Sequence, residues 1–154
     1  MTNIMTRKEI NPLLLESTDS QTLSRLYGDL TPELHDIVCQ LIRWITASSD
    51  TCFDLLVPYR KQELPLRVLL PEDANGSLTA LGVIYDLGPV DTELYCLQDL
   101  LNAEHPYGTL DLINGKLVFS STLIPLFAEA FPAMLASTIN STARILAALE
   151  VMKP

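Results

Sequence analysis

The stretch YGTLDLINGKLVFSSTL, from Tyr107 to Leu123, carries the strongest folding signal in the chain. Apolar and polar side chains alternate in both halves of it, and Asn114-Gly115 stands between them. An Asn-Gly pair takes up the positive φ angles that a two-residue turn between antiparallel strands requires. The stretch therefore predicts a β-hairpin with strands over Tyr107–Ile113 and Lys116–Leu123.

The segments on either side of this hairpin are predicted to be helical. Asp91 is expected to cap a helix that runs to about Glu104 and stops at the His-Pro pair that follows. After the hairpin, Pro125–Met152 has the pattern of a proline-containing loop and then a helix. Pro132 falls in the first turn of that helix, where the missing N–H costs no hydrogen bond.

A long amphipathic helix is predicted upstream, over Thr31–Ser48. Thr31 is placed to cap it, and Pro32 fits its first turn. Its apolar face follows helical spacing and consists of Leu34, Ile37, Val38, Leu41, Ile42 and Ile45.

Three strands are predicted between the two helical segments, over Cys52–Val57, Leu66–Leu70 and Leu78–Leu87. We expect Pro58 and Pro65 to bracket a polar link between the first two strands. Asn75-Gly76 suits a turn with positive φ before the third strand, which favours an antiparallel pair. Gly88-Pro89 is expected to end this part of the sheet.

The predicted order of elements is therefore α-β-β-β-α-β-β-α, which is an α+β pattern with an antiparallel sheet flanked by helices. We expect one domain over residues 31–154. Residues 1–30 show no clear period and are expected to form a loosely held, partly helical arm, with a short helix over Ser20–Tyr27 ended by Gly28.

The charge of the chain narrows the possible partners. Its 154 residues include 19 acids and 10 lysines and arginines, a net charge of −9, so nucleic acid and anionic lipid are disfavoured. The stretch Val68–Gly115 has eight acids and no Lys or Arg: Glu72, Asp73, Asp86, Asp91, Glu93, Asp99, Glu104 and Asp111. An acidic face of this kind commonly serves solubility.

The sequence also predicts a cytoplasmic protein without stable membrane insertion. The start MTNIMTRKEINP lacks the apolar core of a signal peptide. Three widely spaced cysteines, Cys39, Cys52 and Cys96, favour a reducing compartment. The least charged stretch, Leu117–Ala143, is interrupted by prolines, whereas a spanning helix needs about 20 predominantly apolar residues.

No motif of known chemistry is present. The chain lacks a GxSxG elbow, a phosphate-binding loop, a GxGxxG fingerprint and an HExxH helix, and its two histidines, His35 and His105, are interpreted as structural or surface residues. We expect no catalytic residue, no metal site and no cofactor. Trp44 lies off the centre of its helix's apolar stripe, so it belongs either to the margin of the core or to a surface offered to a partner.

The segment LQDLLNAEHPYGTLDLINGKLVFSSTLIP, followed by FPAMLASTINSTARILAALE, resembles the class I type III secretion chaperones, the Tir-chaperone-like family. The resemblance covers about Thr31 to Val151. It rests on the order of the elements in this segment: a Leu-rich helix, a break of small and polar residues, a hairpin, a proline-containing loop and a final helix. It implies a homodimer that binds a secreted effector protein in extended form and keeps it soluble and competent for secretion.

The resemblance also implies two surfaces on this chain. In the family the middle helix and neighbouring strands form the subunit interface, which here implies Leu94, Leu97, Leu101, Leu110 and Leu112. Apolar grooves between the first long helix and the sheet take the side chains of the client, which implies Leu34, Ile42, Trp44, Phe53, Leu55, Leu66 and Val68.

Two alternatives remain open at this point. The chain also resembles the bacterial sensory-transduction regulators, which share the fold and a similar hairpin–helix ending, and this resemblance implies a regulator that acts by protein contact without secretion. An enzyme with a carboxylate site is the third possibility, and it requires several of the eight acids to converge in a concave pocket. Because no catalytic motif is present, we expect a binding protein and not an enzyme.

Overall fold

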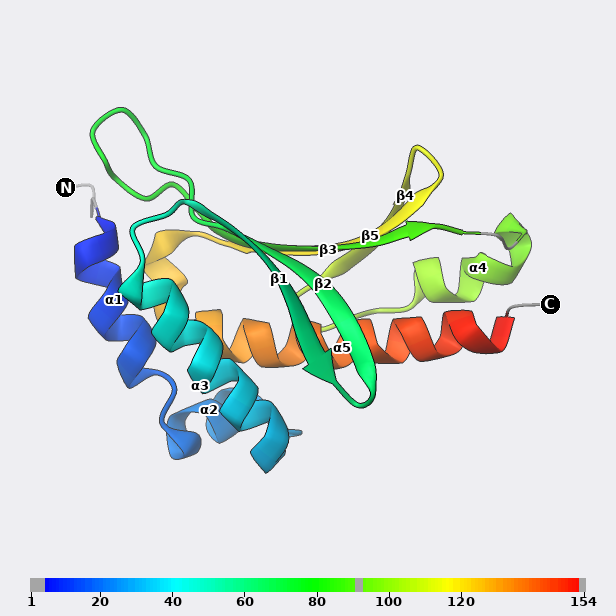
Figure 1. The fold of residues 1–154 in the computed structure, drawn as a ribbon, viewed down its shortest axis with the longest axis horizontal. Helices are drawn as coiled ribbons and strands as arrows, with labels where there is room; N and C mark the ends of the chain where they lie inside the picture. The colour runs from blue at the N-terminus through cyan, green and yellow to red at the C-terminus, as the bar shows by residue number, and fades with distance from the viewer. Residues whose placement is uncertain (1–4, 91–92, 153–154) are drawn as a thin grey trace.

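The computed structural model describes residues 5–90 and 93–152 and shows an α+β fold, as predicted. One five-stranded sheet has the order β1-β2-β3-β5-β4, and every neighbouring pair is antiparallel. The long helix α5 runs beneath the sheet, and the first three helices gather at one end (Figure 1). The opposite face of the sheet is not covered by any helix of the described residues (Figure 1).

The strands are β1 Cys52–Tyr59, β2 Gln62–Leu69, β3 Leu81–Pro89, β4 Thr109–Ile113 and β5 Lys116–Leu123. The hairpin of β4 and β5 is confirmed, with positive φ at both Asn114 and Gly115. Tyr107 has a φ of 64° and lies outside β4, so the strand begins later than predicted.

The first three strands are shifted from their predicted bounds. Pro58 and Pro65 do not bracket a link but lie inside β1 and β2, which a two-residue turn with positive φ at Arg60 and Lys61 joins. A strand tolerates proline where no ladder N–H is needed. Pro58 is on a terminal strand, and the pairing of β2 with β3 begins beyond Pro65, at Leu66.

The predicted end of the sheet at Gly88-Pro89 is an irregularity and not a break. The register of β3 against β5 shifts between Asp86 and Pro89, and Gly88 has a φ of +79°. The strand therefore continues to Pro89 through a bulge, which a glycine with left-handed φ permits.

The helices are α1 Arg7–Glu16, α2 Ser20–Leu26, α3 Pro32–Ala47, α4 Leu94–Asn102 and α5 Phe131–Met152, with a 3-10 helix η1 over Pro125–Ala130. Thr31 caps α3 as predicted, accepting a hydrogen bond from the backbone N–H of Leu34. The N-cap position of α4 belongs to Glu93, and the predicted cap Asp91 lies outside the described residues. None of the helices in the described part of the chain is long and apolar enough to cross a bilayer.

The expectation of a loosely held N-terminal arm is wrong, because α1 packs on α3 and buries Ile10 and Leu14 completely. The signal for this helix is the T-R-K-E sequence at Thr6, which forms a capping box with Glu9. Pro12 interrupts the helical pattern and obscures the period of this segment.

Arg7 fastens α1 to the end of α3. Its guanidinium donates hydrogen bonds to the backbone oxygens of Ile45 at 2.8 Å, Ser48 at 3.0 Å and Asp50 at 2.7 Å. These carbonyls belong to the last turn of α3 and the loop after it, where the helix has no further backbone N–H groups to pair with them. Burial lowers the pKa of Arg7, while the carboxylates of Glu72 and Asp50 act in the opposite direction.

Helix α5 is buried on nearly all sides along its first half. Every residue from Phe131 to Ala143 is buried, including a polar run of Ser137, Thr138, Asn140, Ser141 and Thr142. The hydroxyl of Thr138 lies 2.9 Å from that of Tyr85 in β3, which is itself fully buried. Burial raises the pKa of Tyr85, and the hydrogen bond with Thr138 opposes that shift.

Replacing Arg7 with methionine should lower the free energy of unfolding by about 3 kcal/mol, because three carbonyls lose a charged donor. Urea denaturation followed by circular dichroism measures this loss. Lys8→Met removes the same charge from the exposed neighbouring position and should change stability by less than about 0.5 kcal/mol. Equal effects of the two substitutions would contradict the role assigned to Arg7.

Candidate interaction surface

The edge of the sheet at β1 adjoins a shallow apolar groove. Side chains of α3 and β1 enclose a volume of about 230 Å³ there, with Ile37, Gln40, Leu41 and Trp44 on one side and Leu55, Leu56, Val57 and Pro58 on the other. Trp44 is 45% exposed, and its ring lies 5.3 Å from that of Phe53 at an angle of 60°. Trp44 therefore belongs to the margin of the core and to the surface at once.

The backbone of β1 adds hydrogen-bonding groups to this groove. The two-residue turn closes on the Tyr59–Gln62 pair, and hydrogen-bonded and non-bonded pairs alternate from there along an antiparallel ladder. The N–H groups of Asp54 and Leu56 consequently point away from β2. Pro58 has no N–H to offer, which limits the length over which another strand can pair with this edge.

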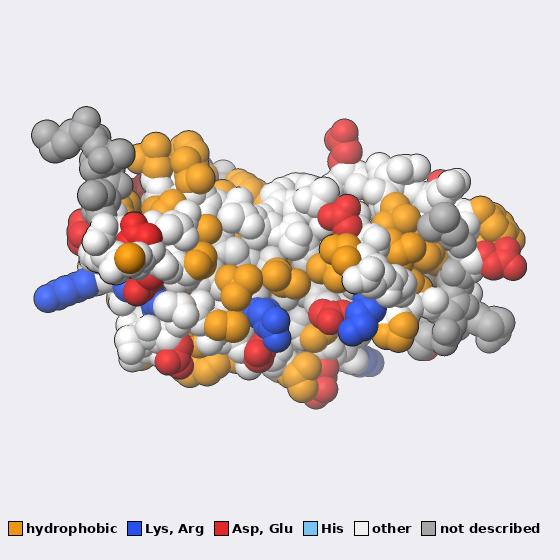
Figure 2. Space-filling model, turned by 90° about the horizontal axis from the view of Figure 1, so that it is seen from above, with side chains coloured by type: hydrophobic (Ala, Val, Ile, Leu, Met, Phe, Trp, Pro, Cys, Tyr) orange, Lys and Arg blue, Asp and Glu red, His pale blue; other side chains and the backbone are white. Residues whose placement is uncertain are grey.

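A second groove crosses the uncovered face of the sheet. It measures about 420 Å³ and is lined by Asp54, Leu55, Leu56, Pro65, Leu66, Arg67, Ile84, Asp86 and Val118. Figure 2 looks onto this face and shows hydrophobic side chains spread over it, with acidic and basic side chains between them. Leu56, 65% exposed, lines both grooves and so joins the β1 edge to the sheet face.

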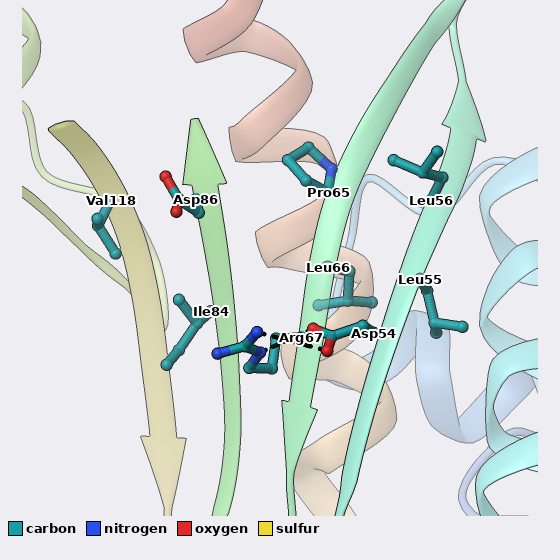
Figure 3. Close-up of a pocket in the computed structure, with 9 residues that line it drawn as sticks. All are labelled: Asp54, Leu55, Leu56, Pro65, Leu66, Arg67, Ile84, Asp86 and Val118. Atoms are coloured by element: carbon teal, nitrogen blue, oxygen red, sulfur yellow. Dashed lines mark hydrogen bonds and ion pairs between the residues drawn. The ribbon is translucent and has the colours of Figure 1, made fainter. Parts of the chain in front are cut away.

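An exposed ion pair lies in the middle of this second groove. Arg67 Nε is 2.7 Å from the carboxylate of Asp54 on the neighbouring strand (Figure 3). The hydrogen bond to Asp54 raises the pKa of Arg67, and Asp86 acts in the same direction. Because both partners are exposed, the pair orients the guanidinium more than it stabilises the fold.

Five of the seven residues assigned to client binding are buried in the core, and of these only Leu66 also lines a groove, the one on the uncovered sheet face. Leu34, Ile42, Phe53, Leu66 and Val68 are at most 4% exposed. These side chains belong to one core cluster formed by α3, β1 and β2. Alternate residues of a strand face opposite sides, and the residues chosen for the client were mostly those that face the core. The remaining two, Trp44 and Leu55, do line the groove at β1.

The residues assigned to the dimer interface divide in a similar way. Leu97 and Leu110 are buried within the chain at 1% and 5% exposure, and Leu101 is partly buried. Leu112 is 39% exposed on β4, the strand at the other end of the sheet. The side chain of Leu94 lies outside what the structure describes.

Sequence analysis did not identify several exposed apolar residues. Leu56 was overlooked. The unbroken run Leu55-Leu56-Val57 must place an apolar side chain on the outward face of β1, because successive residues of a strand face opposite sides. Tyr95 on α4 is 70% exposed, and Leu126 and Phe127 of η1 are exposed as well.

The acidic residues do not converge in the described structure. No three His, Cys, Asp or Glu side chains within residues 5–90 and 93–152 lie close enough to hold a metal ion together. His35 and Cys39 form a pair on α3, with Nε2 and Sγ 3.4 Å apart, and the same nitrogen lies 2.8 Å from the backbone oxygen of Thr18. Because the carbonyl can only accept, that nitrogen carries the proton and is not free to act as a base.

No protein-family model matches this chain, and no curated protein matches it significantly. The interaction surface therefore rests on the geometry of the chain itself.

Two adjacent substitutions test which side of β1 faces outward. Leu56→Glu should change the free energy of unfolding by less than about 0.5 kcal/mol, because position 56 is exposed. Val57→Glu buries a carboxylate at a position that is 3% exposed and should cost about 4 kcal/mol or prevent folding. Urea denaturation of both variants decides the assignment, and the reverse order of effects would mean that the register is off by one residue.

Proposed function

We propose that this chain is a binding protein that holds a polypeptide partner in extended form, acting as a homodimer in the manner of class I type III secretion chaperones. The partner would be a secreted effector, kept soluble and competent for secretion in the cytoplasm. One observation carries the proposal: the outer edge of β1 pairs with no strand of the described residues and lies directly beside an apolar groove.

An extended polypeptide needs these two features together. Its backbone must exchange the hydrogen bonds of water for others, and the outward N–H and C=O groups of Asp54 and Leu56 can supply them by β-augmentation. Its alternate side chains need apolar contacts, and Leu41, Trp44 and Leu56 offer such contacts next to the same edge. The groove is shallow, which suits adaptable contacts with an unfolded client better than it suits a small ligand.

The proposed dimer uses the opposite end of the sheet. Strand β4 is terminal there and packs on α4. Leu112 of β4 and Tyr95 of α4 are exposed apolar side chains in this region. A twofold contact through them would cover apolar surface and leave both β1 edges free for the client.

The dimer can be tested by substituting Leu112 with glutamate. Light scattering of the purified protein should give twice the mass of the chain, and Leu112→Glu should reduce it to a single chain, since a charge is placed in an apolar contact. Thr109→Glu, on the other face of β4 and also exposed, should leave the dimer intact. A monomeric wild-type protein would remove the dimer from the proposal.

Client binding can be tested by a photo-cross-linking residue at position 56, introduced in the cells that make the protein. Irradiation should join it to a secreted protein through a segment that is extended when bound, and the same label at exposed Glu33 should not. With the purified client, hydrogen exchange at the amides of Asp54 and Leu56 should slow.

Two results would contradict the chaperone proposal. Equal cross-linking from positions 56 and 33 would show that β1 is not the contact. A folded signalling protein as the only adduct would instead assign the chain to the regulator alternative.

A further inference from the structure

A cavity with several polar side chains in its lining lies on the other side of the molecule from the uncovered sheet face. It measures about 260 Å³ and is lined by Leu26, Tyr27, Gly28, Asp29, Pro106, Tyr107, Ser137, Asn140, Ser141 and Arg144. Three segments that are distant in sequence form it: the end of α2 with its following loop, the loop before β4, and the buried polar run of α5. It shares no lining residue with either groove of the interaction surface.

Part of the polar lining is already engaged in holding the walls together. Ser137 donates a hydrogen bond to the backbone oxygen of Pro106 at 3.0 Å. Asn140 donates to the hydroxyl oxygen of Tyr27 at 2.8 Å, and its own oxygen accepts from the Tyr59 hydroxyl at 3.4 Å. These bonds fix the cavity on a rigid part of the fold.

Three hydrogen-bond donors at the cavity have no acceptor among the described residues. Tyr27 accepts from Asn140 but its own O–H donates to nothing. Ser141 is only 7% exposed, and its hydroxyl forms no hydrogen bond. Arg144 forms no ion pair within the described part of the chain. Tyr27 is partly buried and Arg144 is exposed, so water reaches these donors in the free protein, and a ligand with acceptor oxygens can replace that water at all three.

The spacing of these residues places two of them on one face of α5. Ser141 and Arg144 are three residues apart, and side chains at that spacing are neighbours on a helix. Tyr27 approaches from α2, which packs on α5. Arg144 acts on the Tyr27 hydroxyl electrostatically: burial raises the pKa of Tyr27, whereas the Asn140 hydrogen bond and the charge of Arg144 lower it.

The charges at the cavity indicate what kind of acceptor fits. Asp29 also lines it and acts on Tyr27 with the opposite sign to Arg144. One arginine and one aspartate leave the cavity lining without net charge, which disfavours a dianion such as phosphate more strongly than a group with a single negative charge. A single carboxylate is planar, matches the fork of a guanidinium, and accepts from two hydroxyls besides.

We propose that this cavity binds a carboxylate group, held by Arg144 with hydrogen bonds from Ser141 and Tyr27. The volume admits a small carboxylic acid or one acidic side chain of a polypeptide. The two sources share the same recognition chemistry, and neither requires the surface at β1.

The test uses acetate, neutral acetamide, inorganic phosphate and the peptide acetyl-Gly-Asp-Gly-amide as probes of the full chain, with amide chemical shifts as the readout. Acetate and the peptide should give saturable shifts at Tyr27, Ser141 and Arg144, and acetamide should not. A peptide that binds tighter than acetate identifies a polypeptide as the source, whereas equal binding identifies a free acid. Tighter binding of phosphate would overturn the assignment to a carboxylate.

Matched variants separate the cavity from the general charge of the protein. Arg144→Gln should weaken acetate binding about tenfold or more, since one charged hydrogen-bonding partner is lost. Arg43→Gln removes the same charge from an exposed position on α3 and should leave binding unchanged. Ser141→Ala and Tyr27→Phe should each weaken it by a smaller factor.

The proposal is overturned if no probe gives saturable shifts, if acetate and acetamide behave alike, or if Arg144→Gln binds as the wild type does. Leu56→Glu serves to keep the two sites apart, because it should abolish client binding at β1 while acetate binding persists. Failure of the chaperone function and failure of this site are therefore distinguishable.

Discussion

The burial of α5 is the constraint on which the rest of the structure depends. Its first half is enclosed by the sheet, by α2 and α3 and by η1, yet it carries five polar residues that each need a hydrogen-bonding partner. Tyr85, Tyr59 and Tyr27 reach it from three different elements. These bonds hold α5 against one side of the sheet, and the other face is not covered by any helix of the described residues (Figure 1).

Much of the fold could be predicted where local chemistry decides it. The Asn114-Gly115 turn and the Thr31 cap act over a few residues, and both were predicted with their elements. Pro58 and Pro65 misled the prediction, since whether a strand tolerates proline depends on which neighbour pairs with it. Helix α1 was missed because Pro12 obscures its period despite the capping box at Thr6, and its burial depends on contacts with α3 that lie far along the chain.

Less of the candidate site could be predicted, because the sequence does not decide which face of each strand meets the core. The elements were correct: α3 and β1 do form a groove, and Trp44 and Leu55 line it. The individual residues depend on which face of each strand meets the core, and a shift of one position exchanges all of them. Leu66 and Val68 were therefore assigned to the surface, although they are buried. The cavity at Arg144 joins three distant segments, so its residues share no pattern in the sequence.

The attachment of α1 through Arg7 also orders events during synthesis. Its acceptors lie 38 to 43 residues further along the chain, and they exist as an array only once α3 has formed and ended. Helix α1 is therefore synthesised before the carbonyls that bind Arg7, and it can dock only after α3 has been made. Until then its apolar residues Ile10 and Leu14 are unsheltered, so this helix is exposed to aggregation before α3 is made.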